Sequence, residues 1–250
     1  MARLARLLLA VLAAGCPAGD GDDDYPIGGG GGGGGTSGPR TDGGIGDGGT
    51  DGPAALRGRV CLLSDLRRLT GATPGDCATT GAGNLRVSLG GGAPGLTATD
   101  GTFTAPARDG TNLAWQVTAQ NLAPSIVPVS AAAPLLLPAI DDADYNDLLL
   151  SNGVTIEQGE GSIVARILRN GTPVMNATAQ IVGGESLQTR YDGTNPTVWA
   201  TTATGVLGVA WLPDNVAGVR ELRVVQGATQ LSVPVSIVDQ AITFVTIVLP

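Results

Sequence analysis

Residues 161–171 read GSIVARILRNG, and this stretch decides the fold class. Apolar side chains occupy both alternating sets of positions across 163–168, so an extended strand here is covered on both faces. Asn170 and Gly171 follow at once, and Asn-Gly is the pair that two-residue hairpin turns favour. The stretch therefore predicts a buried β-strand that ends in a tight turn.

Short alternating runs continue outward from this strand in both directions, at the spacing of about 8–12 residues that is typical of β-sandwiches. Turn-forming pairs separate several of them, so we predict an all-β fold of antiparallel sandwich architecture. The further runs are 85–89, 113–119, 207–211, 222–224, 231–235 and 242–249, and the further turn pairs are Asp100-Gly101, Asp192-Gly193 and Asp214-Asn215.

One helix is expected between the runs, because Asp141 and Asp142 can cap its start and Asn152-Gly153 can end it. Capping also accounts better for the acidic residues here than a calcium-binding loop, whose later Gly and Glu positions are not matched. We expect the part after the helix to fold without the part before it. The predicted order is β-sandwich domain 1 at 55–140, a short helical connector at 141–154 and β-sandwich domain 2 at 155–250.

The two halves echo each other in sequence. A Gly-led strand opens each half, at 58–60 and 161–164, and a turn with Gly leads into a later apolar strand at 99–103 and 204–207. This pattern resembles the carboxypeptidase-regulatory-like, or transthyretin-like, β-sandwich family, although Leu207 stands where the family has an aromatic. The resemblance implies tandem sandwiches of a family whose members are mostly non-catalytic accessory, adhesive or structural modules.

The first residues, 1–15, read MARLARLLLAVLAAG, which is typical of a signal peptide with a positive start and a small-residue end. Its apolar run is too short for a membrane span, which needs ~20 residues. Ala13-Ala14-Gly15-Cys16 resembles the lipobox of bacterial lipoproteins, with Ala13 in place of the usual Leu. The resemblance implies a lipidated Cys16; the alternative is an ordinary signal peptide with an incidental cysteine. Residues 16–54 then hold the lipidated Cys and a disordered linker rich in Gly and Asp.

The composition excludes several chemistries. The chain has no histidine, and its 14 basic residues are all arginine. Phosphate-binding loops need a lysine, and Ser-His-Asp, Cys-His and Ser-Lys nucleophile systems need a base that this chain lacks. Proton transfer between Asp and Glu remains open. The net charge is −8, of which the β region carries only about −4, and this near-neutral surface argues against nucleic-acid binding, which needs basic patches. We expect no cofactor and no metal.

Cys61 and Cys77 are the two cysteines left after Cys16. Exported proteins meet an oxidising environment, so we predict a disulfide between them, worth ~3 kcal/mol for a loop of this length. Two free thiols are the alternative.

Candidate binding residues are few. Tyr191 and Trp199 flank the loop 192–196 and could form a flat apolar platform for a sugar ring; the alternative is ordinary packing. Trp115 lies on the apolar face of its run and is predicted to be core. Glu157 and Glu160 could act as an acid/base couple, although nothing in the sequence places them in a cleft.

These observations predict a non-enzymatic, lipid-anchored protein of the bacterial outer membrane or cell surface. Its β region would serve as a structural module, or as a binding module for an envelope protein or glycan. The alternatives are a carboxylate-based hydrolase of envelope polymers and an accessory subunit of an uptake or secretion complex.

Overall fold

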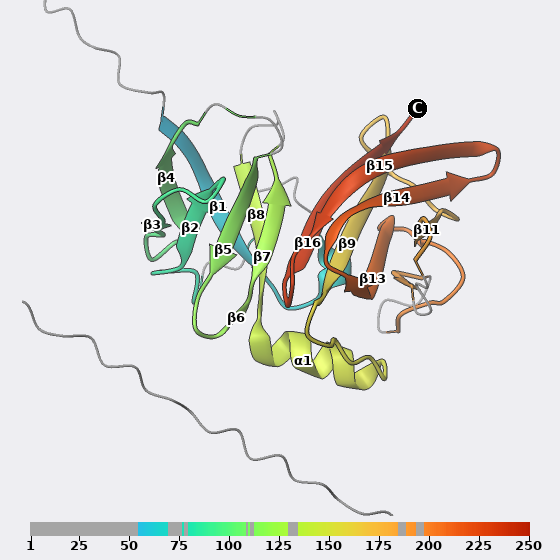
Figure 1. Cartoon of the computed structure of the whole chain (residues 1–250), viewed down its shortest axis with the longest axis horizontal. Coiled ribbons are helices and arrows are strands. Elements are labelled where there is room, and N and C mark those ends of the chain that lie inside the picture. Colours follow the sequence, from blue (N-terminus) through green and yellow to red (C-terminus); the bar gives the residue numbers. More distant parts are fainter. Residues whose placement is uncertain are drawn as a thin grey trace, which may run out of the picture. The chain divides into compact units, whose positions relative to one another are not determined.

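The computed structural model describes residues 55–69, 77, 80–108, 110, 113–129, 135–184, 189–193 and 198–250. The predicted signal peptide, Cys16 and the linker lie outside the described residues. Within the described part, β-strands dominate, together with the α-helix α1 (Asp142–Ser151; Figure 1) and the short 3-10 helix η1 (Leu66–Arg68). The predicted all-β sandwich fold is confirmed.

The first half contains two sheets that face each other. In one, β1 lies between β4, which is antiparallel to it, and β8, which is parallel to it, and β6 pairs with β8. In the other, the antiparallel order is β3-β2-β5-β7. The strands are β1 (Ala55–Leu63), β2 (Arg86–Leu89), β3 (Gly95–Leu96), β4 (Thr102–Pro106), β5 (Ala114–Thr118), β6 (Leu122–Ala123), β7 (Ser125–Pro128) and β8 (Leu135–Asp141).

The second half repeats this arrangement. Strand β9 lies between β13, antiparallel, and β16, parallel, while β11, β14 and β15 form a separate antiparallel sheet. The first strand of each half thus pairs in parallel with the last strand of the same half. The strands are β9 (Glu160–Arg169), β10 (Thr172–Pro173), β11 (Thr178–Ile181), β12 (Arg190–Tyr191), β13 (Val209–Val216), β14 (Gly218–Gln226), β15 (Thr229–Ile237) and β16 (Ile242–Leu249).

A buried threonine fixes the start of the second strand in the first half. The Thr97 hydroxyl accepts a hydrogen bond from the Leu85 N–H at 2.9 Å and donates to the Ala82 carbonyl. The Thr97 N–H donates to the Leu85 carbonyl, and the Thr97 carbonyl accepts from the Asn84 N–H. Asn84 has the left-handed backbone conformation, with φ of 61°. We call this set of four bonds the threonine clasp.

The second half forms the same clasp around Thr204. Its hydroxyl accepts from the Ala177 N–H at 2.9 Å and donates to the Val174 carbonyl at 2.7 Å. Its N–H donates to the Ala177 carbonyl, and its carbonyl accepts from Asn176, whose φ is 58°. The partners have the same spacing in both halves, so the repeat holds at the level of single hydrogen bonds.

The positions of the clasps show that the sequence comparison aligned the two halves in the wrong register. Four residues after each threonine stands a left-handed glycine, Gly101 or Gly208. A Cβ on Gly101 would lie 2.8 Å from the Val60 carbonyl oxygen, and one on Gly208 would lie 2.6 Å from that of Ile167. Gly101 therefore corresponds to Gly208 rather than Gly205. Gly58 and Gly161 are consequently not equivalent, although each opens a strand. The G-x-V pattern is too short to distinguish this wrong alignment of the two halves from the right one.

The two halves are joined by a strand pair. Strand β7 of the first half runs parallel to β16 of the second, with Ser125 opposite Ile242 and Ile126 opposite Thr243. The Ile242 N–H donates to the Pro124 carbonyl at 2.8 Å. One nine-stranded sheet therefore includes strands from both halves. The domain boundaries at 140 and 155 stay a prediction, but the sheet does not stop at them.

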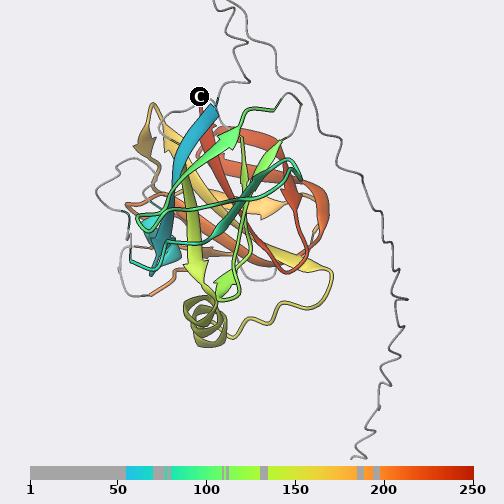
Figure 2. The ribbon, with the colours of Figure 1, turned by 90° about the vertical axis from the view of Figure 1, so that its left-hand side faces the viewer.

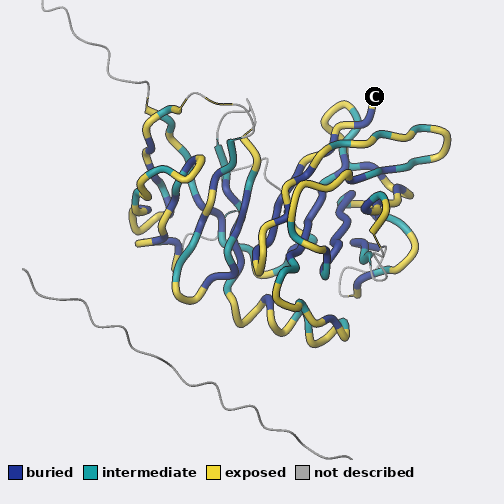
Figure 3. Tube along the Cα trace, in the orientation of Figure 1, coloured by how far each residue is buried: buried dark blue, intermediate teal, exposed yellow. Residues whose placement is uncertain are grey.

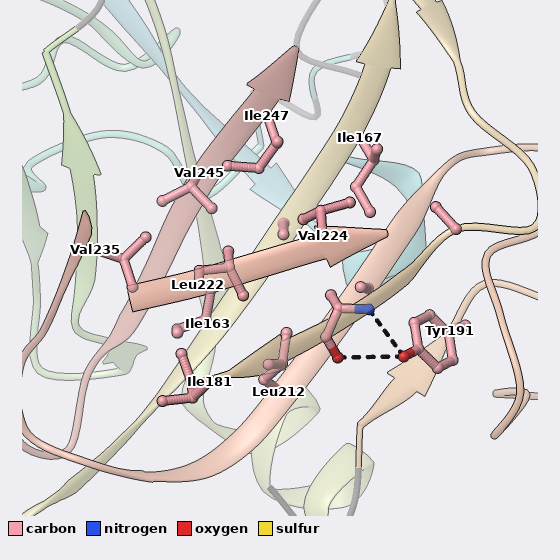
Figure 4. Packing of buried hydrophobic residues seen from close by; sticks show 14 of the residues in the cluster. Ile163, Ile167, Ile181, Tyr191, Leu212, Leu222, Val224, Val235, Val245 and Ile247 are labelled. Carbon is pink, nitrogen blue, oxygen red and sulfur yellow. Dashed lines mark hydrogen bonds between the residues drawn. The ribbon is translucent and has the colours of Figure 1, made fainter. Parts of the chain in front are cut away.

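Buried side chains form three clusters, and Figure 3 shows how burial concentrates along the strands. One cluster lies wholly in the second half, including Ile163, Leu212 and Leu222 (Figure 4). One lies wholly in the first half and contains Trp115, whose prediction as a core residue is confirmed. The third cluster contains residues of both halves, and we call it the junction cluster. Its buried members are Leu66, Leu69, Ala123, Ile140, Tyr145, Val154, Val164, Trp199, Val209, Trp211, Ile242 and Phe244.

Helix α1 (Asp142–Ser151) lies between the last strand of the first half and the first strand of the second. The Asp141 side chain accepts a hydrogen bond from the Ala143 N–H and so caps the start. The helix ends at Asn152, followed by the left-handed Gly153. The predicted helix and both of its ends are confirmed. Figure 2 shows α1 almost along its axis, below the strands. Among the described residues, no helix is long and apolar enough to cross a membrane.

The prediction of a turn at Asp214-Asn215 is wrong. Both residues lie inside β13, where the register with β9 shifts between Leu212 and Asn215. The Asn215 amide donates to the carbonyls of Leu212 and Pro213, so a buried side chain satisfies the backbone of this irregularity. An Asp-Asn pair that favours a turn locally is here held in a strand by its tertiary surroundings.

Candidate functional site

A groove with a volume of about 360 Å³ lies beside α1, between the helix, the end of β6 and loop residues that precede β9 and β16. Apolar side chains make up most of its lining, together with amide, hydroxyl and carboxylate groups. It is lined by Ala123, Pro124, Asp142, Tyr145, Asn146, Leu149, Leu150, Val154, Thr155, Ile156 and Gln240.

Tyr145 anchors the helix beneath this groove. Its hydroxyl lies 2.6 Å from the Ser162 Oγ on β9, and the Trp211 indole N–H also reaches that oxygen, at 3.4 Å. Burial raises the pKa of Tyr145 well above its usual value, and hydrogen bonds from Ser162 and Trp211 only partly oppose this. Tyr145 therefore stays neutral, and its hydrogen bond to Ser162 ties α1 to the junction cluster.

Polar side chains that line the groove make local hydrogen bonds. The Asn146 amide donates to the Asp142 carboxylate at 3.2 Å, and the Gln240 amide donates to the Glu157 carbonyl at 2.7 Å. Asp142 is the one carboxylate among the lining residues. Glycosidases use two carboxylates around the bond that they cleave, and the described residues that line the groove supply one.

The predicted couple of Glu157 and Glu160 does not line this groove. Glu160 accepts a hydrogen bond from the Glu157 N–H at 2.9 Å, so it closes a local turn. Its charge instead acts on Asp214. Burial, and secondarily the negative charge of Glu160, raise the pKa of Asp214, while Arg190 lowers it.

The structure does not form the predicted Tyr191–Trp199 platform, because it packs both rings inside. Tyr191 is 4% exposed and Trp199 is 9% exposed. The Tyr191 hydroxyl donates to the Ala179 carbonyl and accepts from the Ala179 N–H, inside the second-half core (Figure 4). Trp199 belongs to the junction cluster instead. The two rings thus lie in different layers, and the alternative of ordinary packing describes them.

The ring of Trp199 lies close to a guanidinium group and to a second aromatic ring. The Arg67 guanidinium lies 5.6 Å from the ring centroid, and Asp65 holds that guanidinium through an ion pair of 2.7 Å. The Trp211 ring lies 5.4 Å away, centroid to centroid. Arg67 belongs to η1 (Leu66–Arg68), a first-half element, so Trp199 contributes to the contact between the halves.

The predicted disulfide between Cys61 and Cys77 is present. Cys61 lies on β1 and is buried, and the bridge spans 16 residues of sequence. Of the other predicted site residues, Cys16 lies outside the described residues.

A buried carboxylate that the sequence did not single out is Asp192. Its Oδ1 accepts hydrogen bonds from the N–H groups of Gly205 and Val209 at 2.8 and 2.9 Å, and its Oδ2 accepts from Leu207 at 2.7 Å. The Asp192-Gly193 pair indicates a turn in the sequence, but nothing there identifies backbone partners more than ten residues away. The role of Asp192 is to hold the loop before β13.

No family model matches the chain, and no curated protein matches it. Several solved structures are similar to it, among them the two that follow. The Bacillus anthracis TIE protein shows 10% identity and a TM-score of 0.26, over 66% of this chain and 31% of that one. A streptococcal ancillary pilin shows 8% identity and a TM-score of 0.22, over 78% and 62% respectively. The chain thus spans about a third of the first protein and less than two thirds of the second, and neither likeness carries an argument about function.

Proposed function

We propose that the chain is a non-enzymatic, lipid-anchored protein of the bacterial outer membrane or cell surface, whose two sandwiches act together as a structural or binding module. The predicted signal peptide and Cys16 support the anchor. The Cys61–Cys77 disulfide supports export, since such bonds persist in oxidising compartments.

The observation that carries the module is the β7–β16 pair. It continues one sheet from the first half into the second, and the junction cluster buries side chains from both halves next to it. A pair of sandwiches linked in this way resists bending at the connector, as a spacer or a rigid binding surface requires. The groove beside α1 gives this module a place to hold part of an envelope protein or glycan.

The anchor is tested with Cys16→Ser. The unaltered chain, made in a bacterial host, should fractionate with membranes and carry acyl chains by intact-mass measurement. The Cys16→Ser chain should lose both properties. If mass and fractionation were the same for both chains, the anchor would be rejected.

The binding role of the groove is tested with Leu150→Arg, which places a long charged side chain at its mouth. Leu150 is 76% exposed, and Val219, which is 75% exposed and outside the groove, provides the matched control Val219→Arg. Envelope material retained by the unaltered chain and by Val219→Arg, but not by Leu150→Arg, would support the groove. Equal retention by all three chains would exclude it as the binding place.

A carboxylate-based hydrolase of envelope polymers is the second candidate. The observation in its favour is the raised pKa of Asp214 next to Glu160, because a general acid needs a carboxyl that stays protonated. Release of soluble fragments from purified envelope polymers, lost in Asp214→Asn, would support it. Absence of fragments with the unaltered chain would reject it.

A further inference from the structure

The free edge of β15 corresponds to an edge that is already occupied in the first half. Strand β5 pairs with β7, with Val117 opposite Ser125, and β14 pairs with β15, with Val224 opposite Leu231. Each clasp contains one left-handed Asn. Val117 and Val224 each lie opposite the residue that follows this Asn by three positions, so they occupy equivalent places in the two halves. Strand β15 is therefore the second-half counterpart of β7.

The counterpart strands also agree in sequence. Counting from Ser125 and Leu231, Ile126 corresponds to Ser232 and Pro128 to Pro234. Strand β7 pairs with β16 at Ser125 and Ile126 although Pro128 follows. A proline two residues further along is thus compatible with strand addition at the places that correspond to Leu231 and Ser232. Among the described residues, β15 pairs with β14 alone.

The hairpin geometry shows which groups of β15 point away from β14. Gln226 and Thr229 close a two-residue turn, so they exchange backbone hydrogen bonds, and such pairs then alternate along the ladder. Even-numbered residues of β15 therefore point their N–H and C=O groups outward. Pro234, which has no N–H, and the Ser236 carbonyl, which accepts from the Thr243 hydroxyl at 2.9 Å, both fit this assignment.

The side chains of this edge are divided between two faces. Leu231 and Val233 are half-buried and pack against the second-half core, at its margin. Gln230, Ser232 and Pro234 are exposed on the other face. Adding a strand here would continue the apolar layer of the core without burying a charge, since β15 carries no charged residue.

We propose that β15 pairs antiparallel with β15 of a second copy of this chain, about a two-fold axis at Ser232. In this register Ser232 of each copy exchanges two backbone hydrogen bonds with Ser232 of the other, and the Gln230 N–H donates to the Pro234 carbonyl of the second copy. Leu231 of one copy lies beside Val233 of the other. A strand edge that is its own complement gives a closed two-fold dimer, the commonest form of protein association.

The dimer is tested with the chain carrying Cys16→Ser, so that no acyl chain drives association. Light-scattering mass across a concentration series should rise from one to two copies and stop there. Ser232→Pro removes an outward N–H at a position like that of Pro234, and it should raise the dimer dissociation constant about 10- to 100-fold, because two hydrogen bonds are lost per dimer. Ser232→Ala keeps the N–H and should leave the constant unchanged.

A covalent readout separates loss of the edge from loss of the fold. In the same background, Ser232→Cys should form a disulfide-linked dimer on oxidation, because the two side chains face each other across the axis. Ser236→Cys is exposed on the same face but lies off the axis, and it should remain uncrosslinked. A monomer at all concentrations, growth beyond two copies, or equal cross-linking at both positions would each overturn the proposal. None of these results bears on the anchor at Cys16.

Discussion

Single buried polar side chains organise the loops of this protein. Asp192 and the two clasp threonines are nearly or fully buried, and each bonds to backbone groups far along the chain. Such roles are invisible in the sequence, because Thr and Asp at these positions look like ordinary loop residues. Local signals did suffice where the partners are close in sequence, as for the Asp141 cap.

Replacing Asp192 by Asn should destabilise the fold by about 2 kcal/mol, because one acceptor oxygen becomes an NH₂ group that faces a backbone N–H. The free energy of unfolding in urea measures this cost. Asp239→Asn is the control: the exposed Asp239 accepts from the Gly159 N–H, and its loss should cost well under half as much. Equal costs for the two variants would show that the Asp192 bonds do not hold the loop.

Asp214 should give a pH-dependent stability of known sign. Its pKa is raised above the usual value of 3.8 in the folded protein, by burial first and by Glu160 second. The protonated carboxyl therefore favours folding, and that contribution is lost as the pH rises through the folded pKa. Asp214→Asn should raise the melting temperature at pH 7, and the gain should vanish below about pH 3.8. A gain that persists at low pH would contradict this cause.

The pKa shift of Asp100 has the opposite sign to that of Asp214, so its effect on stability provides a comparison. Hydrogen bonds from Thr102, and to a lesser degree Arg59, lower the pKa of this exposed carboxyl. Asp100→Asn should therefore lower the melting temperature at neutral pH, with the difference fading as the pH falls through the lowered pKa. Parallel curves for Asp214→Asn and Asp100→Asn would reject at least one of the two assignments.

At the scale of elements, the alternating runs predicted most of the long strands. The strand at 160–169, the strand at 242–249 and α1 all lie where the sequence placed them. The pairing could not be predicted, because alternation fixes which face of a strand is apolar but not which strand lies beside it. The parallel pairs β1–β8, β9–β16 and β7–β16 all join segments distant in sequence.

The threonine clasps give an element-scale prediction. Because both clasps make the same four hydrogen bonds, Thr97→Val and Thr204→Val should destabilise the chain by similar amounts, about 1–3 kcal/mol each. Thr→Ser at either position keeps the hydroxyl and should recover most of that loss. Urea unfolding of the four variants tests this. A cost confined to one of the two Val variants would show that the halves do not use the clasp alike.

At the scale of the whole molecule, the sequence predicted two sandwiches but gave no sign of the sheet and cluster that join them. Side chains of the junction cluster, such as Leu66 and Trp211, look like ordinary core residues in each half. The second-half core is complete within residues 163–249, so the expectation that residues 155–250 fold alone stays a prediction. In the intact chain, however, the β7–β16 pair should couple the two halves.

The most direct test of this coupling uses the disulfide, which lies in the first half only. Peptide-resolved hydrogen exchange during urea unfolding, with and without reductant, would follow β5 in the first half and β14 in the second. Reduction should destabilise the protein by ~3 kcal/mol. If the halves form one cooperative unit, the unfolding midpoints of β5 and β14 coincide and fall together on reduction. A midpoint that falls for β5 while that of β14 stays fixed would contradict the account, because the halves would then unfold independently.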